Sequence, residues 1–111
     1  MQKELQDKKI TTVERLLTYC VEKHGDKKAQ GTRKVERVEK VTRDDGLEIL
    51  KFHLGGYEWR SYQEMGRRVS KVGRGLRELG MEPRERLVVY ADTSADWLVC
   101  ALAVRRILNK I

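Results

Sequence analysis

The chain has 111 residues and a formal net charge of +7, with 37% charged and 40% hydrophobic residues. This length allows at most one domain with a modest core, because a domain of this size buries only about 60–70% of the surface that its unfolded chain exposes. Cys20 and Cys100 lie far apart and outside any CxxC pattern, which argues against a disulfide framework and against a zinc site. The longest apolar run, residues 97–104, is too short to cross a bilayer, and the N-terminus has no secretory apolar segment.

A basic chain invites a nucleic-acid or anionic-membrane hypothesis, since clustered Lys and Arg side chains bind phosphates by releasing counterions. The positive charge is spread thinly here, at +3 in residues 1–51 and +4 in residues 52–111. Neither half is a basic tail. A small basic module that binds anionic membrane or nucleic acid is therefore the alternative hypothesis and not the leading one.

Residues 1–10 are polar and mixed in charge, which predicts a disordered lead-in. A helix is predicted over residues 12–25, with Thr11 and Glu14 at capping-box spacing and Gly25 as its stop. The apolar face of this helix repeats at spacings of three and four, through Val13, Leu16, Leu17, Cys20 and Val21.

Residues 26–51 give a weaker signal and are expected to be extended, because their valines at spacing three fit neither a regular strand nor a long helix. Asp44-Asp45-Gly46 predicts a turn, after which apolar and polar residues alternate over residues 50–54 as in a half-buried strand. Gly55-Gly56 then predicts a hairpin turn. A second strand follows, with Tyr57 and Trp59 on one face.

The strongest signal is an amphipathic helix that begins after Ser61 and ends before Gly80. Ser61 and Glu64 form a second capping-box pattern, and Gly80 is suited to the position just past the helix. Gly66 and Gly73 lie seven residues apart beside the apolar row, which predicts a close approach by another backbone. The apolar row consists of Tyr62, Met65, Val69, Val72, Leu76 and Leu79.

Residues 87–91 form a continuous apolar run, which is typical of a parallel strand covered on both faces. Thr93 and Asp96 are placed to cap a following helix, whose body at residues 97–104 is apolar nearly all round and therefore expected to be buried. Residues 105–111 turn basic where a second parallel strand would be expected. The fold class is thus α/β, or α+β within this chain: a helix, a small antiparallel hairpin, an amphipathic helix and the first strand-helix unit of a larger sheet, in an incomplete domain.

A row of basic residues on the central helix could bind phosphate groups. Burial of each apolar residue on the opposite face contributes roughly 1.5–3 kcal/mol, whereas a cation near an anionic surface gains about 1 kcal/mol, further weakened by salt. The apolar face therefore decides where the helix packs, and the basic row is interpreted as a solvated face. This row comprises Arg67, Arg68, Lys71, Arg74 and Arg77.

Other candidate site residues are also better explained by structure. His24 and His53 have no partner at catalytic or metal-ligand spacing and are interpreted as a surface and a strand histidine, with His24 near the C-terminus of the first helix. Tyr57, Trp59 and Tyr62 could stack on nucleic-acid bases, but packing of the hairpin on the central helix explains them more simply. The Gly73-Arg74-Gly75 segment lies inside a helix and is wrongly placed for a phosphate loop.

Several pieces of the chain match a known family in order and spacing over about ninety residues, and the predicted helix over residues 12–25 is the first of them. The further matching pieces are Gly31-Thr32-Arg33, Leu54-Gly55-Gly56-Tyr57-Glu58-Trp59 with Ser61-Tyr62, Val72-Gly73-Arg74-Gly75-Leu76 through Leu79-Gly80, and Asp92-Thr93-Ser94-Ala95-Asp96-Trp97. With these pieces the chain resembles the N-terminal region of the long-chain fatty acyl-CoA synthetases of the adenylate-forming superfamily.

The resemblance implies an AMP-forming ligase that converts a fatty acid, ATP and coenzyme A into acyl-CoA, AMP and pyrophosphate, with Mg²⁺ as cofactor. The phosphate loop and adenine-binding motifs of that family have no counterpart here, so catalytic, cofactor-binding and metal-binding residues are expected to be none in this chain, and the isolated chain is expected to be inactive. Residues 11–104 would be the N-terminal part of the synthetase domain, and residues 105–111 a divergent or truncated end.

The same resemblance implies that the partner of this chain is the remainder of a parent synthetase, with a fatty acid as substrate of the whole enzyme and with no nucleic acid. A cytoplasmic location is expected, and peripheral association of the full-length form with the endoplasmic reticulum or another organelle membrane is left open. A third hypothesis is an unproductive truncated product that exposes its apolar strand and last helix and aggregates.

Overall fold

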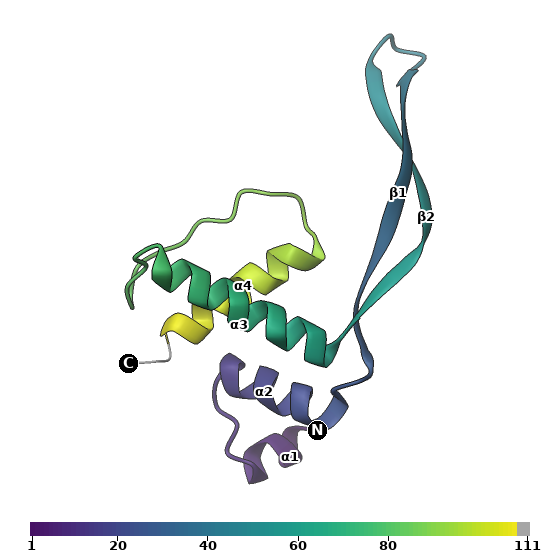
Figure 1. Cartoon of the computed structure of the whole chain (residues 1–111). Coiled ribbons are helices and arrows are strands. Elements are labelled where there is room, and N and C mark those ends of the chain that lie inside the picture. The colour runs from purple at the N-terminus through teal and green to yellow at the C-terminus, as the bar shows by residue number, and fades with distance from the viewer. Residues whose placement is uncertain (109–111) are drawn as a thin grey trace.

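A computed structural model describes residues 1–108 as a group of helices from which one long β-hairpin projects (Figure 1). The predicted α+β mixture and the incomplete character of the domain are confirmed. The molecule measures 57 × 33 × 23 Å along its principal axes, which reflects the projecting hairpin. The elements in chain order are α1 (Gln2–Asp7), α2 (Val13–His24), β1 (Lys28–Thr42), β2 (Glu48–Ser61), α3 (Tyr62–Glu78) and α4 (Ala95–Leu108).

The N-terminal segment contains the short helix α1, where the sequence predicts a disordered lead-in. Glu4 connects α1 to α2, because its carboxylate accepts hydrogen bonds from the Tyr19 hydroxyl and from Lys23 Nζ, the latter at 2.8 Å. Tyr19 and Lys23 lie fifteen and nineteen positions after Glu4 in the sequence. The local polarity of residues 1–10 therefore does not predict these contacts.

Helix α2 begins one residue later than its capping-box pattern indicates. The N-cap is Thr12 and not Thr11, because the Thr12 hydroxyl accepts a hydrogen bond from the Arg15 backbone N–H at 3.2 Å. The helix ends at His24, directly before Gly25, as predicted.

The hairpin turns at Asp44-Asp45-Gly46, and the prediction of a hairpin turn at Gly55-Gly56 is wrong. Gly46 has φ +85°, and the Arg43 N–H donates to the Leu47 carbonyl at 2.8 Å across the turn. Gly55 and Gly56 lie inside β2, which pairs with β1 on both sides of these two glycines. The region from 28 to 42, expected only to be extended, is a full strand.

Two bulges in the middle of the hairpin keep one face continuous. Val35 pairs with Leu54, whereas Arg33 pairs with Tyr57 on one side and Arg37 with His53 on the other. Each strand therefore carries one extra residue near this point, and the two irregularities compensate. Directly paired residues share a face, so one face collects seven apolar side chains. We call it the apolar face; it comprises Val35, Val38, Leu50, Phe52, Leu54, Tyr57 and Trp59.

Helix α3 has the predicted boundaries. The Ser61 hydroxyl accepts from the Glu64 N–H at 3.1 Å, and the Glu64 carboxylate accepts from the Ser61 N–H at 2.7 Å, which completes the capping box. At the other end, Gly80 has φ +100°, and its N–H and that of Met81 bond back to the last turn of the helix, to the Arg77 and Leu76 carbonyls.

The core lies between α2, α3 and α4. Val69, Val99 and Ala103 are almost completely buried, and Leu17 and Met65 join them. The backbones of α3 and α4 lie close together at Gly73, since the Ala103 carbonyl oxygen is 3.6 Å from the position that a Cβ would occupy, which is an ordinary van der Waals distance. The close approach predicted at Gly73 is thus present.

Residues 87–91 do not form a strand, so this part of the prediction is wrong for the chain as described. Val88 and Tyr90 are 87% and 102% exposed in an irregular connection to α4, because no neighbouring strand offers hydrogen-bond partners.

Helix α4 differs from its prediction in its cap and in its exposure. Its cap is Ser94 and not Thr93, since the Ser94 hydroxyl accepts from the Trp97 N–H at 3.2 Å. Its Trp97 and Leu98 side chains are exposed, because α3 and α2 cover only one side of the helix. The predicted divergent end at 105–111 falls partly outside the described residues, at 109–111, and α4 continues through Leu108.

Candidate functional site

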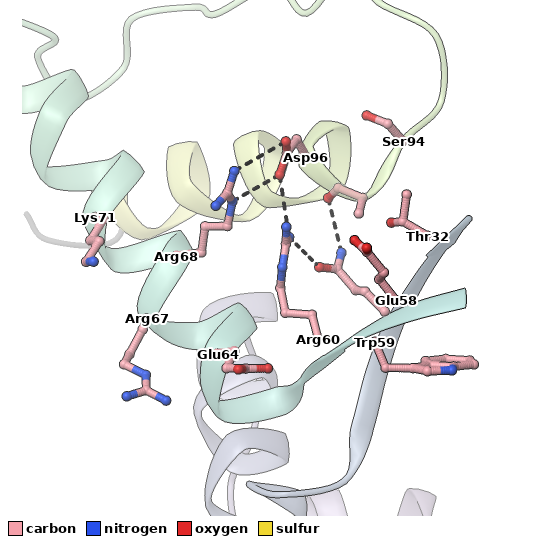
Figure 2. A pocket seen from close by; sticks show the side chains of 12 residues that line it. Thr32, Glu58, Trp59, Arg60, Glu64, Arg67, Arg68, Lys71, Ser94 and Asp96 are labelled. Carbon is pink, nitrogen blue, oxygen red and sulfur yellow. Dashed lines mark hydrogen bonds and ion pairs between the residues drawn. The ribbon is translucent and has the colours of Figure 1, made fainter. Parts of the chain in front are cut away.

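A large hollow lies where the base of the hairpin meets α3 and the first turn of α4 (Figure 2). It is open to solvent and has a volume of about 730 Å³. Its lining is mostly charged and polar, and comes from both strands, α3 and the segment that leads into α4. The lining residues are Gln30, Thr32, Glu58, Trp59, Arg60, Glu64, Arg67, Arg68, Lys71, Ser94, Ala95 and Asp96.

Asp96 is the centre of this hollow. Arg68 of α3 donates to both carboxylate oxygens, from Nε to Oδ1 at 3.0 Å and from Nη2 to Oδ2 at 3.4 Å. Arg60 of β2 reaches the same carboxylate from Nη1 at 3.4 Å, as Figure 2 shows. One carboxylate in the first turn of α4 thus holds cations from two other elements, in a position that also suits the helix dipole.

Gln30 completes the connection on the side of β1. Its Oε1 accepts from Arg60 Nη1 at 3.0 Å, and its Nε2 donates to the Ala95 carbonyl at 3.1 Å. Gln30 and Arg60 are directly paired across the hairpin, which places both side chains on the face toward α4. This network of Gln30, Arg60, Arg68 and Asp96 fixes the base of the hairpin against the helices.

Most charged side chains of the hollow hold the hairpin and the helices in position. Arg60 and Arg68 share the single negative charge of Asp96, so this group keeps a net charge of +1. Glu64 is engaged in the capping box, where the hydrogen bond from the Ser61 N–H lowers the pKa of its carboxyl group. Arg67 and Lys71 point away from Asp96 (Figure 2) and have no ion pair within residues 1–108.

The hollow does not fit the magnesium ion that the resemblance implies for the whole enzyme. Its one central carboxylate, that of Asp96, is already occupied by arginines, and among the described residues no three His, Cys, Asp or Glu side chains are placed to hold a metal ion.

The basic row on α3 is divided among different surroundings. Arg68 belongs to the Asp96 network, while Arg74 and Arg77 line a second, smaller hollow beside Arg106 of α4. Arg106 itself bonds to the Ser70 hydroxyl and lies 3.6 Å from the Glu14 carboxylate. Arg67, Arg68 and Lys71 thus line the first hollow, whereas Arg74 and Arg77 line the second. The five side chains do not all converge on one point, and their interpretation as a solvated face stays a prediction.

The two histidines lie where the sequence suggests, at the end of α2 and on β2. The His24 ring is 5.6 Å from the Tyr62 ring. The His53 Nε2 is 2.9 Å from the Glu39 carboxylate and 3.1 Å from Arg37 Nη2, on the hairpin face opposite to the apolar face.

The prediction that the aromatic residues pack the hairpin on the central helix is wrong for two of the three. Tyr62 contacts the core, but Tyr57 and Trp59 are 61% and 49% exposed. Their rings stack on each other with centroids 5.6 Å apart, and Trp59 lies over Gly31, where a Cβ would be 2.8 Å from the ring. Both side chains belong to the apolar face, which extends along the hairpin away from the helices, so α3 does not cover them.

A model of the AMP-binding enzyme family matches residues 10–107. The chain belongs to this family. Its resemblance to the long-chain acyl-CoA synthetases is confirmed by curated relatives. "Long chain acyl-CoA synthetase 8" of Arabidopsis thaliana is 33% identical over 88 residues, which cover 79% of this chain and 12% of the relative.

Two further relatives agree. "Palmitoyl-CoA ligase FUM16" of Gibberella moniliformis is 29% identical, covering 80% of this chain and 14% of its own length. "Long-chain-fatty-acid--CoA ligase 1" of Saccharomyces cerevisiae is 26% identical, covering 81% of this chain and 15% of its own length. The chain thus spans 12–15% of the length of these relatives. No solved structure matches it.

The sequence indicates only part of the Asp96 network. It marks Asp96 as a helix-cap residue and as part of the segment from Asp92 to Trp97 that resembles the family, but it does not mark Gln30 and Arg60 as site residues. The only available signal was the position of Arg60 next to the capping box of α3, since the pairing of Gln30 with Arg60 depends on the bulged register.

Proposed function

We propose that this chain is the N-terminal part of a long-chain fatty acid–CoA ligase that forms acyl-CoA, AMP and pyrophosphate from fatty acid, ATP and coenzyme A. The match of the AMP-binding enzyme family across residues 10–107, with relatives named as long-chain synthetases, carries this proposal. Residues 11–104 would then belong to the synthetase domain, and the protein would act in the cytoplasm.

In this proposal the chain has a structural role and is inactive alone. ATP, Mg²⁺ and coenzyme A would be bound by the remainder of the synthetase, which is also the partner of this chain. The irregular segment at 87–91, with Val88 and Tyr90 exposed, would gain a neighbouring strand there.

The test compares the 111-residue chain with the complete polypeptide encoded at the same locus, in ATP–pyrophosphate exchange with palmitate. We expect exchange only from the complete polypeptide, whose additional sequence should contain a Ser/Thr/Gly-rich phosphate loop. Exchange by the 111 residues alone would overturn the structural role. A coding sequence without that loop in any frame would overturn the ligase assignment.

A further inference from the structure

We propose that the apolar face of the β1–β2 hairpin docks on lipid bilayers that contain anionic lipids. The inference goes beyond the ligase assignment and does not depend on it. It rests on three observations: a continuous apolar and aromatic surface, cations distributed along that surface, and a polar surface on the reverse side.

The apolar face is continuous because the two bulges compensate. Without them, the spacing of three between Val35 and Val38, and between Leu54 and Tyr57, would put these side chains on opposite sides of the sheet. With them, the pairs Val35–Leu54 and Val38–Phe52 follow Arg33–Tyr57 on one side. Every apolar side chain of this face is exposed.

Cations accompany the aromatic rings of this face. Lys28 Nζ lies 5.1 Å from the centroid of the Trp59 ring, and the Arg33 guanidinium lies 5.8 Å from that of Tyr57. Lys40 stands opposite Leu50 on the same face, while the acid of this face, Glu48, lies next to the turn. Tyr and Trp beside Lys and Arg suit the interface of an anionic membrane, where rings enter the headgroup region and cations meet lipid phosphates.

The reverse face is mostly polar. Arg37, Glu39 and His53 form a cluster there, and Lys51 stands opposite Glu39. The hairpin projects from the helices (Figure 1), so its apolar face is free to lie on a flat surface. The apolar face carries more positive than negative side chains, which favours an anionic bilayer as its partner. A second copy of the chain is disfavoured, because two identical positively charged faces would repel each other.

Binding is measured with the full 111-residue chain and large unilamellar vesicles, either of phosphatidylcholine alone or with added phosphatidylserine. We expect the chain to co-sediment with the anionic vesicles. The bound fraction should decrease at high salt, because salt screens the attraction between the cations of the chain and the lipid phosphates. In a Trp97→Phe variant, Trp59 becomes the single tryptophan. Its emission should shift to the blue on binding and be quenched by brominated lipids.

Matched variants separate the two faces. Phe52→Ser on the apolar face and Ile49→Ser on the reverse face alter side chains of the same strand that are 55% and 43% exposed. Only Phe52→Ser should weaken binding, by about threefold to tenfold given the apolar area involved. The pair Arg33→Gln with Lys40→Gln should weaken binding by about fivefold for each cation. The control pair Lys34→Gln with Lys51→Gln removes the same charge elsewhere on the hairpin and should have a smaller effect. Circular dichroism shows whether each variant keeps the hairpin.

Several outcomes would overturn the proposal. These are absence of binding to anionic vesicles, equal binding to neutral vesicles, or equal losses from variants of the two faces. If sedimentation equilibrium instead shows a dimer that Phe52→Ser dissociates, the face belongs to a second copy. If the complete polypeptide buries Trp59 and protects it from brominated lipids, a protein segment covers the face.

Discussion

Gly66 shows how a single missing side chain sets the distance between α2 and α3. A Cβ at Gly66 would lie 2.9 Å from Val21 Cγ2, closer than real Cβ contacts occur. The sequence predicted a backbone at this position, and the structure places a side chain there. Gly75, in the same helix, has no atom within 4 Å of the corresponding position.

Gly75→Ala should raise the free energy of unfolding by about 0.5–1 kcal/mol, since alanine favours the helix over glycine. Gly66→Ala should instead lower the free energy of unfolding by about 1–3 kcal/mol, because the added methyl group overpacks the contact with Val21. Urea denaturation measures both. The double variant Gly66→Ala with Val21→Ala should recover part of the loss, and equal stabilisation by both single glycine substitutions would contradict the close contact.

Glu4 makes the attachment of α1 dependent on pH. Hydrogen bonds from Lys23, and then from Tyr19, lower the pKa of the Glu4 carboxyl group from 4.5 to about 2. A carboxyl group whose pKa is lower in the folded state stabilises that state above its unfolded pKa, and this contribution disappears as the pH falls through the folded pKa. Contact with Glu4 likewise raises the pKa of Lys23, so that partner stays charged throughout this range.

Acidification should therefore release α1 from α2 between pH 4.5 and about pH 2, with α1 attached at neutral pH. Backbone amide chemical shifts of residues 2–7, followed by NMR across this range, measure the release. Glu4→Gln is the control and should remove this transition, because its side chain does not titrate. A wild-type titration curve identical to that of Glu4→Gln would contradict the role of this carboxylate.

At the scale of elements, Asp96 joins three of them through two arginines. These ion pairs are partly exposed, so each contributes little to stability, at about 0–1 kcal/mol. Their main effect is on orientation, because Arg60 stands at the base of the hairpin and Arg68 on α3. The network therefore limits how far the hairpin can swing relative to the helices.

Asp96→Ala should leave the unfolding free energy within about 1–2 kcal/mol of the wild type but broaden the range of hairpin orientations. Residual dipolar couplings of β1 and β2, compared with those of α3, measure this change. Asp92→Ala is the control, since Asp92 lies in the preceding irregular segment and has no ion pair within residues 1–108. Unchanged couplings in Asp96→Ala would contradict the orienting role.

The helices could be predicted from the sequence more reliably than the hairpin. Ser61, Glu64 and Gly80 mark α3 by local interactions, and these boundaries are confirmed. Gly55-Gly56 predicts a hairpin turn, because two glycines between apolar runs usually indicate a turn. The actual register contains a bulge there, and the valine spacing of three over 35 and 38 is its counterpart on the other strand.

The candidate site was less predictable for the same reason. Asp96 could be found as a helix-start residue, but its partners Gln30 and Arg60 come from the two strands whose pairing the sequence did not reveal. Similarly, residues 87–91 have the composition of a strand, yet strand formation needs a neighbour that residues 1–108 do not provide. Local sequence specifies helix ends, whereas these features depend on distant partners.

The whole molecule is more extended than a compact domain of its length. Its radius of gyration is 18.3 Å, compared with about 13 Å expected for a globular chain of about a hundred residues. The difference comes from the hairpin, which carries about half of the exposed large apolar side chains among the described residues, while the core is confined to α2, α3 and α4.

Small-angle X-ray scattering of the monomeric chain should therefore give a radius of gyration near 18 Å. The distance distribution should have a tail toward the 57 Å long axis. A variant lacking residues 33–57, with the remaining strand ends joined by a short Gly/Ser linker, is the control and should approach the compact value. A wild-type radius of about 13 Å would mean that the hairpin folds back on the helices.

The turn at Asp44-Asp45-Gly46 lies at the outer end of the hairpin, away from the helical core (Figure 1). Lengthening a flexible loop is inexpensive, at about 0.6 kcal/mol for each doubling of its length, and loop tips of this kind tolerate inserted sequence. Extra residues at this tip would leave the strand register, both bulges and the Asp96 network unchanged. The tip is therefore the place where members of the family can differ in length, and where a reporter peptide can be inserted, without altering either face of the hairpin.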